Sequence, residues 1–181
     1  MKREAIHYGL VAAVSASLIC GLVAYRLPAA AESGLPRVEL NAERIGPRAI
    51  EELTAKSVPR DYAFAWQSIE QALAENQPDL LEGYLTGVAA ENFRRRVASQ
   101  AQSGLRTRLS DRGHRLEGLF YSPAGDAMEL RDRAELDLQI LDGGKVIYDQ
   151  PLKAEYLVLM TPGADRWLLR DIQDVGGAPN Q

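Results

Sequence analysis

Asp132 is the residue whose setting in this sequence most suggests acid–base chemistry. It alternates in phase with Met128, Leu130 and Ala134, so in an extended strand its carboxyl group would point toward the buried side. A carboxylate removed from water has a raised pKa and can transfer protons. A single bulge would turn it outward instead, and the sequence suggests no histidine partner for it. We therefore keep Asp132 as a candidate without expecting catalysis.

An anion site is suggested by the consecutive residues Arg94, Arg95 and Arg96. Successive helical residues lie about 100° apart, so these three side chains would point to three different sides of a helix. Together with Arg106 and Arg108 they define a basic surface that would suit anionic headgroups or an acidic partner. The alternative, which we favour, is an ordinary solvated face neutralised by acids of the sheet.

Three aromatic residues are candidates for lining a ligand pocket: Trp66, Tyr156 and Trp167. Large aromatic side chains are also the usual material of a core. We favour core packing between the first helix and the sheet, and keep the pocket as the alternative.

Composition limits the classes of function. The chain has 181 residues, of which 46% are apolar, so it can bury a sizeable core. Its net charge of −4 gives no overall positive field, and we expect no nucleic-acid partner. The only cysteine is Cys20, and the only histidines, His7 and His114, are far apart in the sequence. Such a chain lacks the usual ligands of a zinc site, so we expect no metal and no cofactor.

The elements that position these residues follow an apolar N-terminal run. Residues 8–25 carry no charge and are just long enough for a transmembrane helix, with residues 1–7 as a short cytoplasmic tail. The alternative is a signal peptide cleaved near Ala29, Ala30 and Ala31. In both cases we expect the C-terminal domain on the extracytoplasmic, periplasmic side, anchored through the single span or released from it.

A linker is expected over residues 26–57, which contain several prolines and glycines and one short extended piece. A short helix within it begins at Pro47 and ends before Pro59. The compact domain follows at residues 58–175, and residues 176–181 form a flexible polar tail.

Helices come first in this domain. Asp61 is placed to cap an amphipathic helix, Pro78 opens a short second helix, and residues 88–103 form a third. We therefore expect three helices before the sheet begins.

Strands follow the helices. The clearest is residues 128–140, where apolar and charged residues alternate, and a hairpin turn at residues 142–145 leads to a return strand with Pro151 at an edge or bulge. Further strands are expected after a turn at residues 111–113 and over residues 166–175. This order predicts an α+β fold, with three helices packed on a curved antiparallel sheet as a cone-like barrel.

Several short motifs carry a family resemblance. They are the stripe Trp66, Ile69 and Leu73, the turn Leu85-Thr86-Gly87 followed by Phe93, and the segments Tyr156-Leu157-Val158 and Trp167-Leu168-Leu169. In these motifs the domain resembles nuclear transport factor two-like proteins. Within that group it looks most like the C-terminal domain of plastid and cyanobacterial division proteins of the accumulation-and-replication-of-chloroplasts type. The resemblance implies a cone made of a bent sheet and three helices.

The resemblance also implies a docking module rather than an enzyme. A short tail, one span and one cone are similar in layout to membrane-anchored components of type IV secretion and of lipid-transport (Mce) operons. We expect a non-catalytic scaffold that binds envelope or membrane proteins and could pair with a second copy through its sheet. The first alternative is a small-molecule or lipid-binding cone, and the second is an isomerase- or cyclase-like enzyme that uses Asp132.

Overall fold

A computed structural model describes residues 34–176 of the chain. The predictions for the tail at residues 1–7, the span at residues 8–25, the cleavage site at residues 29–31 and the tail beyond Gly176 lie outside the described residues. Within the described part, no helix is both long and apolar enough to cross a bilayer.

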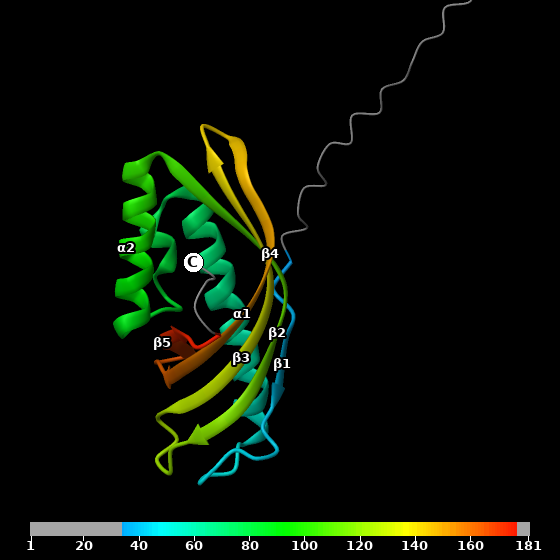
Figure 1. Cartoon of the computed structure of the whole chain (residues 1–181). Coiled ribbons are helices and arrows are strands. Elements are labelled where there is room, and N and C mark those ends of the chain that lie inside the picture. The colour runs from blue at the N-terminus through cyan, green and yellow to red at the C-terminus, as the bar shows by residue number, and fades with distance from the viewer. Residues whose placement is uncertain (1–33, 177–181) are drawn as a thin grey trace, which may run out of the picture. The chain divides into compact units, whose positions relative to one another are not determined.

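The first helix, α1, spans Glu52–Glu75 and continues without a break through Pro59 (Figure 1). The predicted helix end before Pro59 is therefore wrong. A proline inside a helix costs about 3 kcal/mol because it removes a backbone donor. Here Val58 and Tyr62, on either side of it, have no exposed surface, so the apolar stripe of the helix is packed across the proline. That packing outweighs the local preference.

The prediction that Asp61 caps a helix is wrong, because Asp61 lies in the third turn of α1. Its side chain is buried, and a helix that starts nine residues earlier leaves it no free N-terminal donors to bind. It accepts a hydrogen bond instead from the backbone at the beginning of the last strand.

The helix count also differs from the prediction. Residues Pro78–Leu81 form a single 3₁₀ turn, η1, rather than a second helix. The next helix, α2, spans Gly87–Ser103 and agrees with the predicted residues 88–103. It ends at Gly104, whose φ of 73° is the left-handed conformation that glycine adopts at helix ends. The described chain thus has two α-helices and one 3₁₀ turn.

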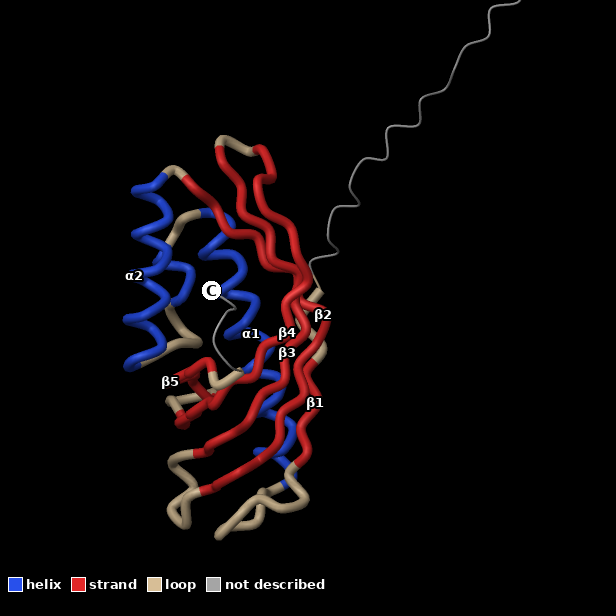
Figure 2. The backbone as a smooth tube through the Cα atoms, in the orientation of Figure 1, coloured by secondary structure: helices blue, strands red, loops and turns tan. Residues whose placement is uncertain are grey.

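Five strands form one curved sheet in the order of the sequence, and the predicted α+β class is confirmed (Figures 1 and 2). The strands are β1 (Val38–Asn41), β2 (Leu105–Tyr121), β3 (Met128–Asp142), β4 (Lys145–Pro162) and β5 (Trp167–Asp174). The last four are antiparallel, but β1 pairs with β2 in parallel, so the predicted purely antiparallel sheet is wrong. Since β1 and the start of α1 precede Val58, the fold begins earlier in the chain than expected.

A turn predicted at residues 111–113 is instead a bulge inside β2. Asp111 pairs with Leu136 and Gly113 with Glu135, which leaves Arg112 as one extra residue on this strand. Gly113 has a φ of 144°, a backbone conformation that glycine adopts more readily than other residues. The chain can therefore bend here without leaving the sheet.

The hairpin of β3 and β4 extends past the ends of both helices (Figure 2). The ladder with β5 covers only Tyr156–Pro162, so within residues 34–176 the first ten residues of β4 pair with β3 alone. Pro151 pairs with Asp137 of β3 in this stretch, whose outer edge has no partner strand among the described residues, so of the predicted edge or bulge the structure shows the edge. Ile147 is an extra residue, because its neighbours Val146 and Tyr148 pair with Leu141 and Ile140.

Candidate functional site

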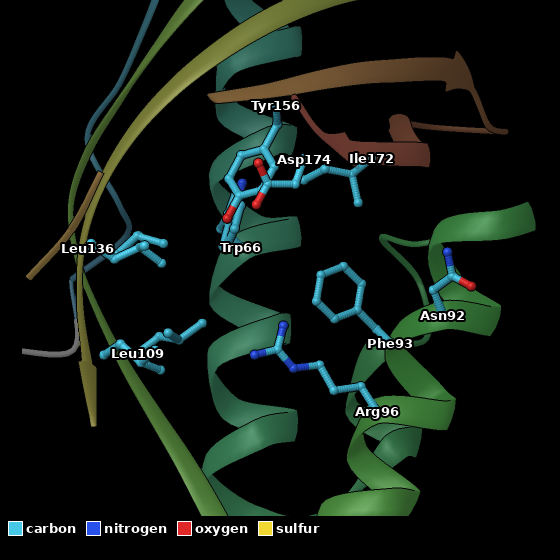
Figure 3. A pocket seen from close by; sticks show the side chains of 11 residues that line it. Trp66, Asn92, Phe93, Arg96, Leu109, Leu136, Tyr156, Ile172 and Asp174 are labelled. Carbon is cyan, nitrogen blue, oxygen red and sulfur yellow. The ribbon is translucent and has the colours of Figure 1, made fainter. Parts of the chain in front are cut away.

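A pocket of about 240 Å³ opens between α2 and the concave side of the sheet, with α1 behind it (Figure 3). Its lining residues are Trp66, Asn92, Phe93, Arg96, Leu109, Leu136, Leu138, Leu152, Tyr156, Ile172 and Asp174. The wall is therefore mostly apolar, with a few polar groups, which is the usual composition of a ligand pocket.

Each wall of the pocket follows from the periodicity of its element. On α2, Asn92 and Arg96 are four residues apart and lie on one side with Phe93 between them. On β3, Leu136 and Leu138 are two residues apart and therefore share the face that carries Asp132. The alternation that predicted an inward-facing strand thus also builds the pocket.

Arg96 differs from Arg94 and Arg95 in its ion pairing. Arg94 pairs with Glu82 at 3.8 Å and Arg95 with Glu91 at 3.9 Å, whereas Arg96 pairs with no acid among residues 34–176. In Figure 3 its side chain reaches from α2 toward the space beside Phe93. The helical spacing predicted that the three arginines point to different sides, but not that one of them borders a cavity.

The other two basic residues lie elsewhere. Arg106 and Arg108 are on β2 beside a second hollow, bordered by Gly104 and the hairpin turn at Gly143 and Gly144. Arg108 donates to Gln139 at 3.3 Å. The five predicted arginines therefore do not form one patch.

Tyr156 contributes the hydroxyl group of the pocket. Burial, together with the nearby Asp174 and Asp132 carboxylates and against the opposing effect of Arg96, raises its pKa to about 12. The hydroxyl group therefore stays protonated and can donate a hydrogen bond.

A buried charge cluster lies behind the pocket, centred on His114. Its Nδ1 is 2.7 Å from Oδ2 of Asp132, its Nε2 is 2.5 Å from Oδ2 of Asp111, and the Tyr62 hydroxyl donates to Asp132 at 2.8 Å. The side chains of His114 and Asp132 have no exposed surface. The inward position predicted for Asp132 is therefore confirmed, but the absence of a histidine partner is wrong.

His114 is a cation in this cluster at neutral pH. Burial by itself would lower its pKa, but the hydrogen bonds and charges of Asp111 and Asp132 raise that pKa to about 9. Both ring nitrogens then carry protons and donate to the two carboxylates. Glu70 is close by, and burial together with the Asp111 charge raises its pKa to about 7.

Trp66 forms the wall between the cluster and the pocket. Its ring centroid is 4.7 Å from that of His114 and 5.7 Å from that of Tyr156. Asp132 is not among the lining residues of the pocket. The cluster therefore holds α1, β2 and β3 together and has no contact with the space that a ligand would occupy.

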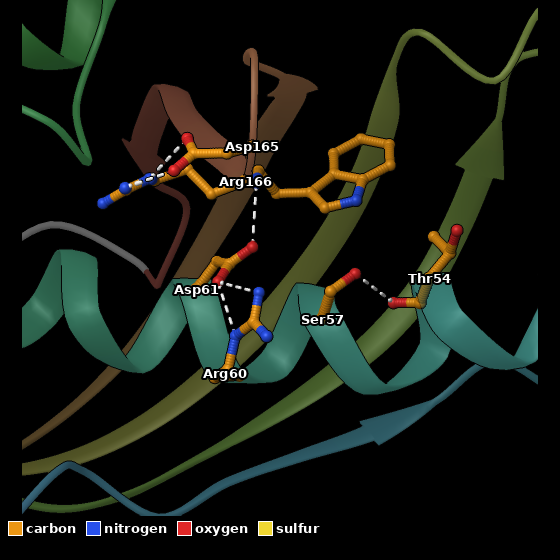
Figure 4. A network of polar contacts seen from close by, with 7 residues as sticks. Thr54, Ser57, Arg60, Asp61, Asp165 and Arg166 are labelled. Atoms are coloured by element: carbon orange, nitrogen blue, oxygen red, sulfur yellow. Dashed lines mark hydrogen bonds and ion pairs between the residues drawn. The ribbon is translucent and has the colours of Figure 1, made fainter.

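Of the three predicted aromatic residues, the structure brings together only Trp66 and Tyr156. Trp167 is buried away from the pocket and packs against Tyr121, with ring centroids 6.2 Å apart. Its backbone N–H donates to Oδ2 of Asp61 at 2.8 Å, while Arg60 donates to Oδ1 of the same carboxylate (Figure 4). Trp167 and Asp61 thus join the start of β5 to α1.

The position of His114 beside Asp132 could not be read from the sequence. Leu116 lies opposite Asp132, with His114 two residues further along, only because the register of β2 and β3 shifts between Gly118 and Phe120. Such diagonal neighbours on one sheet face are within reach of long side chains.

Within residues 34–176, no group of three histidine, cysteine or acidic residues is arranged to hold a metal.

No family model and no curated protein matches the chain. Among solved structures, the intermembrane-space region of the chloroplast protein ARC6 matches with a TM-score of 0.60 at 14% identity, over 71% of this chain and 98% of that one. A putative scytalone dehydratase from Novosphingobium aromaticivorans matches with a TM-score of 0.45 at 10% identity, over 68% of this chain and 85% of that one. The described domain has the nuclear transport factor two-like fold and is similar to that region of ARC6, as its motifs predicted.

Proposed function

We propose that the chain is a non-catalytic protein-interaction module of an envelope complex. The observation that carries this proposal is the exposed apolar surface of the projecting hairpin. Val146, Ile147 and Tyr148 expose 41%, 55% and 41% of their surface on a strand whose outer edge is unpaired among the described residues. Clustered apolar exposure of this kind is typical of sites that bind another macromolecule.

The setting of the domain belongs to the same proposal. Its likeness to a region that lies in an intermembrane space supports a position outside the cytoplasm. The uncharged apolar sequence of residues 8–25 supports a single span as its anchor. The partner is then an envelope or membrane protein with an apolar surface of its own. Pairing of two copies through the sheet stays a prediction.

The enzyme alternative lacks access to its proposed acid. Asp132 is completely buried, Tyr62 and His114 occupy one of its carboxylate oxygens, and Trp66 lies between the cluster and the pocket. A general acid or base must come within hydrogen-bonding distance of its substrate. The small-molecule alternative is favoured by the pocket between α2 and the sheet.

Site-specific photo-crosslinking in membranes tests the interaction proposal. A photoreactive residue at position 148 should give one discrete protein adduct, and Ile147→Asp should abolish it without changing the thermal unfolding of the domain. Leu53 is 81% exposed at the start of α1, so Leu53→Asp is the matched control and should leave the adduct unchanged. The proposal is wrong if no adduct forms at position 148, or if Ile147→Asp leaves it intact.

A further inference from the structure

We propose that the pocket between α2 and the sheet binds a single-chain amphiphile with one anionic head group, of the medium-chain carboxylate type. This site is independent of the hairpin surface and supplies a binding activity beyond protein docking. Three properties of the pocket support it: its cation, its wall and its size.

The cation is Arg96. Its guanidinium group borders the pocket and has no acidic partner among residues 34–176, in contrast to Arg94 and Arg95. A guanidinium presents several N–H donors in a planar fork that matches a carboxylate. Because Arg96 is also exposed to solvent, its side chain can adjust to a bound head group without disturbing the core.

The wall determines the rest of the ligand. Next to Arg96 the ring of Phe93 faces the leucine-rich inner side of the sheet, which offers Leu109, Leu136 and Leu138. An alkyl chain placed there would be removed from water on both sides, by Phe93 on one and by the leucines on the other. A compact polar anion would gain nothing from these residues, so the ligand must be amphipathic.

The remaining polar groups set the orientation of the ligand. Asp174 and the Tyr156 hydroxyl lie together in Figure 3, on the other side of Phe93 from Arg96. Asp174 repels an anion, while Arg96 attracts it. The head group is therefore placed at Arg96 and the chain runs inward along Phe93.

The size of the pocket limits the ligand to one chain. Its volume of about 240 Å³ is below the range of roughly 300–1,000 Å³ that is typical of sites for drug-sized molecules. A phospholipid with two acyl chains would exceed it several times. A single short chain with one carboxylate is the class that fits.

Calorimetric titration of the full chain with decanoate, below its micellar concentration, tests the proposal. Decanoate should bind at one site, and decanol, which has the same chain without the charge, should bind about tenfold more weakly or worse, since a hydrogen bond to a charged group contributes roughly 1.5–3 kcal/mol. Arg96→Gln should weaken decanoate binding by a similar factor and leave decanol unchanged.

Arg95→Gln is the matched control, because Arg95 is on the same helix but pairs with Glu91. It should bind decanoate like the unaltered chain. Absence of saturable decanoate binding, equal binding of decanoate and decanol, or an Arg96→Gln variant with unchanged decanoate affinity would each overturn the proposal. None of these variants touches the hairpin, so the two proposals can fail separately.

Discussion

The charge on His114 should make the fold lose stability as the pH rises above neutrality. Its pKa is raised from 6.5 to about 9 in the folded chain, so the folded state holds a proton that the unfolded state releases. The stabilisation is fully present below pH 6.5 and disappears as the pH rises through about 9. This difference between the pKa of His114 in the unfolded and folded states corresponds to about 3 kcal/mol of unfolding free energy.

Urea unfolding followed by circular dichroism, at intervals between pH 4.5 and 9, measures this effect. His114→Gln should remove most of the slope, because glutamine does not titrate. Glu70 gives a separate control: its pKa is raised from 4.5 to about 7, so its contribution is lost between those values, before the histidine window. Glu70→Gln should therefore flatten the curve below pH 7 and leave the loss between pH 7 and 9.

The reasoning would be refuted by a stability that stays constant from pH 6.5 to 9 in the unaltered chain. It would also be refuted by a His114→Gln variant with the original slope. Either result would mean that the imidazole is neutral in the folded state, and that the two carboxylates do not hold it as a cation.

Three other predictions concern the fold. Asp61→Ala should lower the free energy of unfolding by about 2 kcal/mol in urea titrations, since the buried acceptor of the first N–H of β5 is lost; a change below 0.5 kcal/mol would contradict this role. Gly118→Ala should cost about 1–2 kcal/mol because its Cβ would lie 2.8 Å from Cδ1 of Ile45, whereas Gly34→Ala, in open space, should cost far less. Removal of residues 1–26 should leave the far-ultraviolet circular dichroism of a folded α+β domain; a disordered spectrum would show that the core needs the N-terminal run.

The sheet and its inward face were predictable because alternation is a local signal. The pattern over residues 128–140 identified β3 and turned Asp132 inward, both of which the structure confirms. The order of helices before the long strands, and the motifs around Trp66 and Trp167, were enough for the α+β class and the kind of fold, but not for the number of helices or for β1.

The remaining features depend on contacts that no local pattern contains. His114 meets Asp132 only through the register of two strands, and Arg112 becomes a bulge only because β2 stays in the sheet on both sides of it. Pro59 looked like a helix end, yet burial of the residues around it decided the outcome. The helical spacing separated Arg96 from Arg94 and Arg95, but it carries no information about the sheet that lies opposite.

Among the described residues the outer edge of β4 has no partner strand along Lys145–Ala154, which bears on the growth of sheets from one chain to the next. A ten-residue strand with free N–H and C=O groups is a template on which further chains can add and grow into fibrils. Pro151 lacks the N–H that such growth requires, and the extra residue at Ile147 breaks the even spacing of the remaining groups. Pro151 and the bulge at Ile147 therefore oppose the stacking of identical copies along this edge.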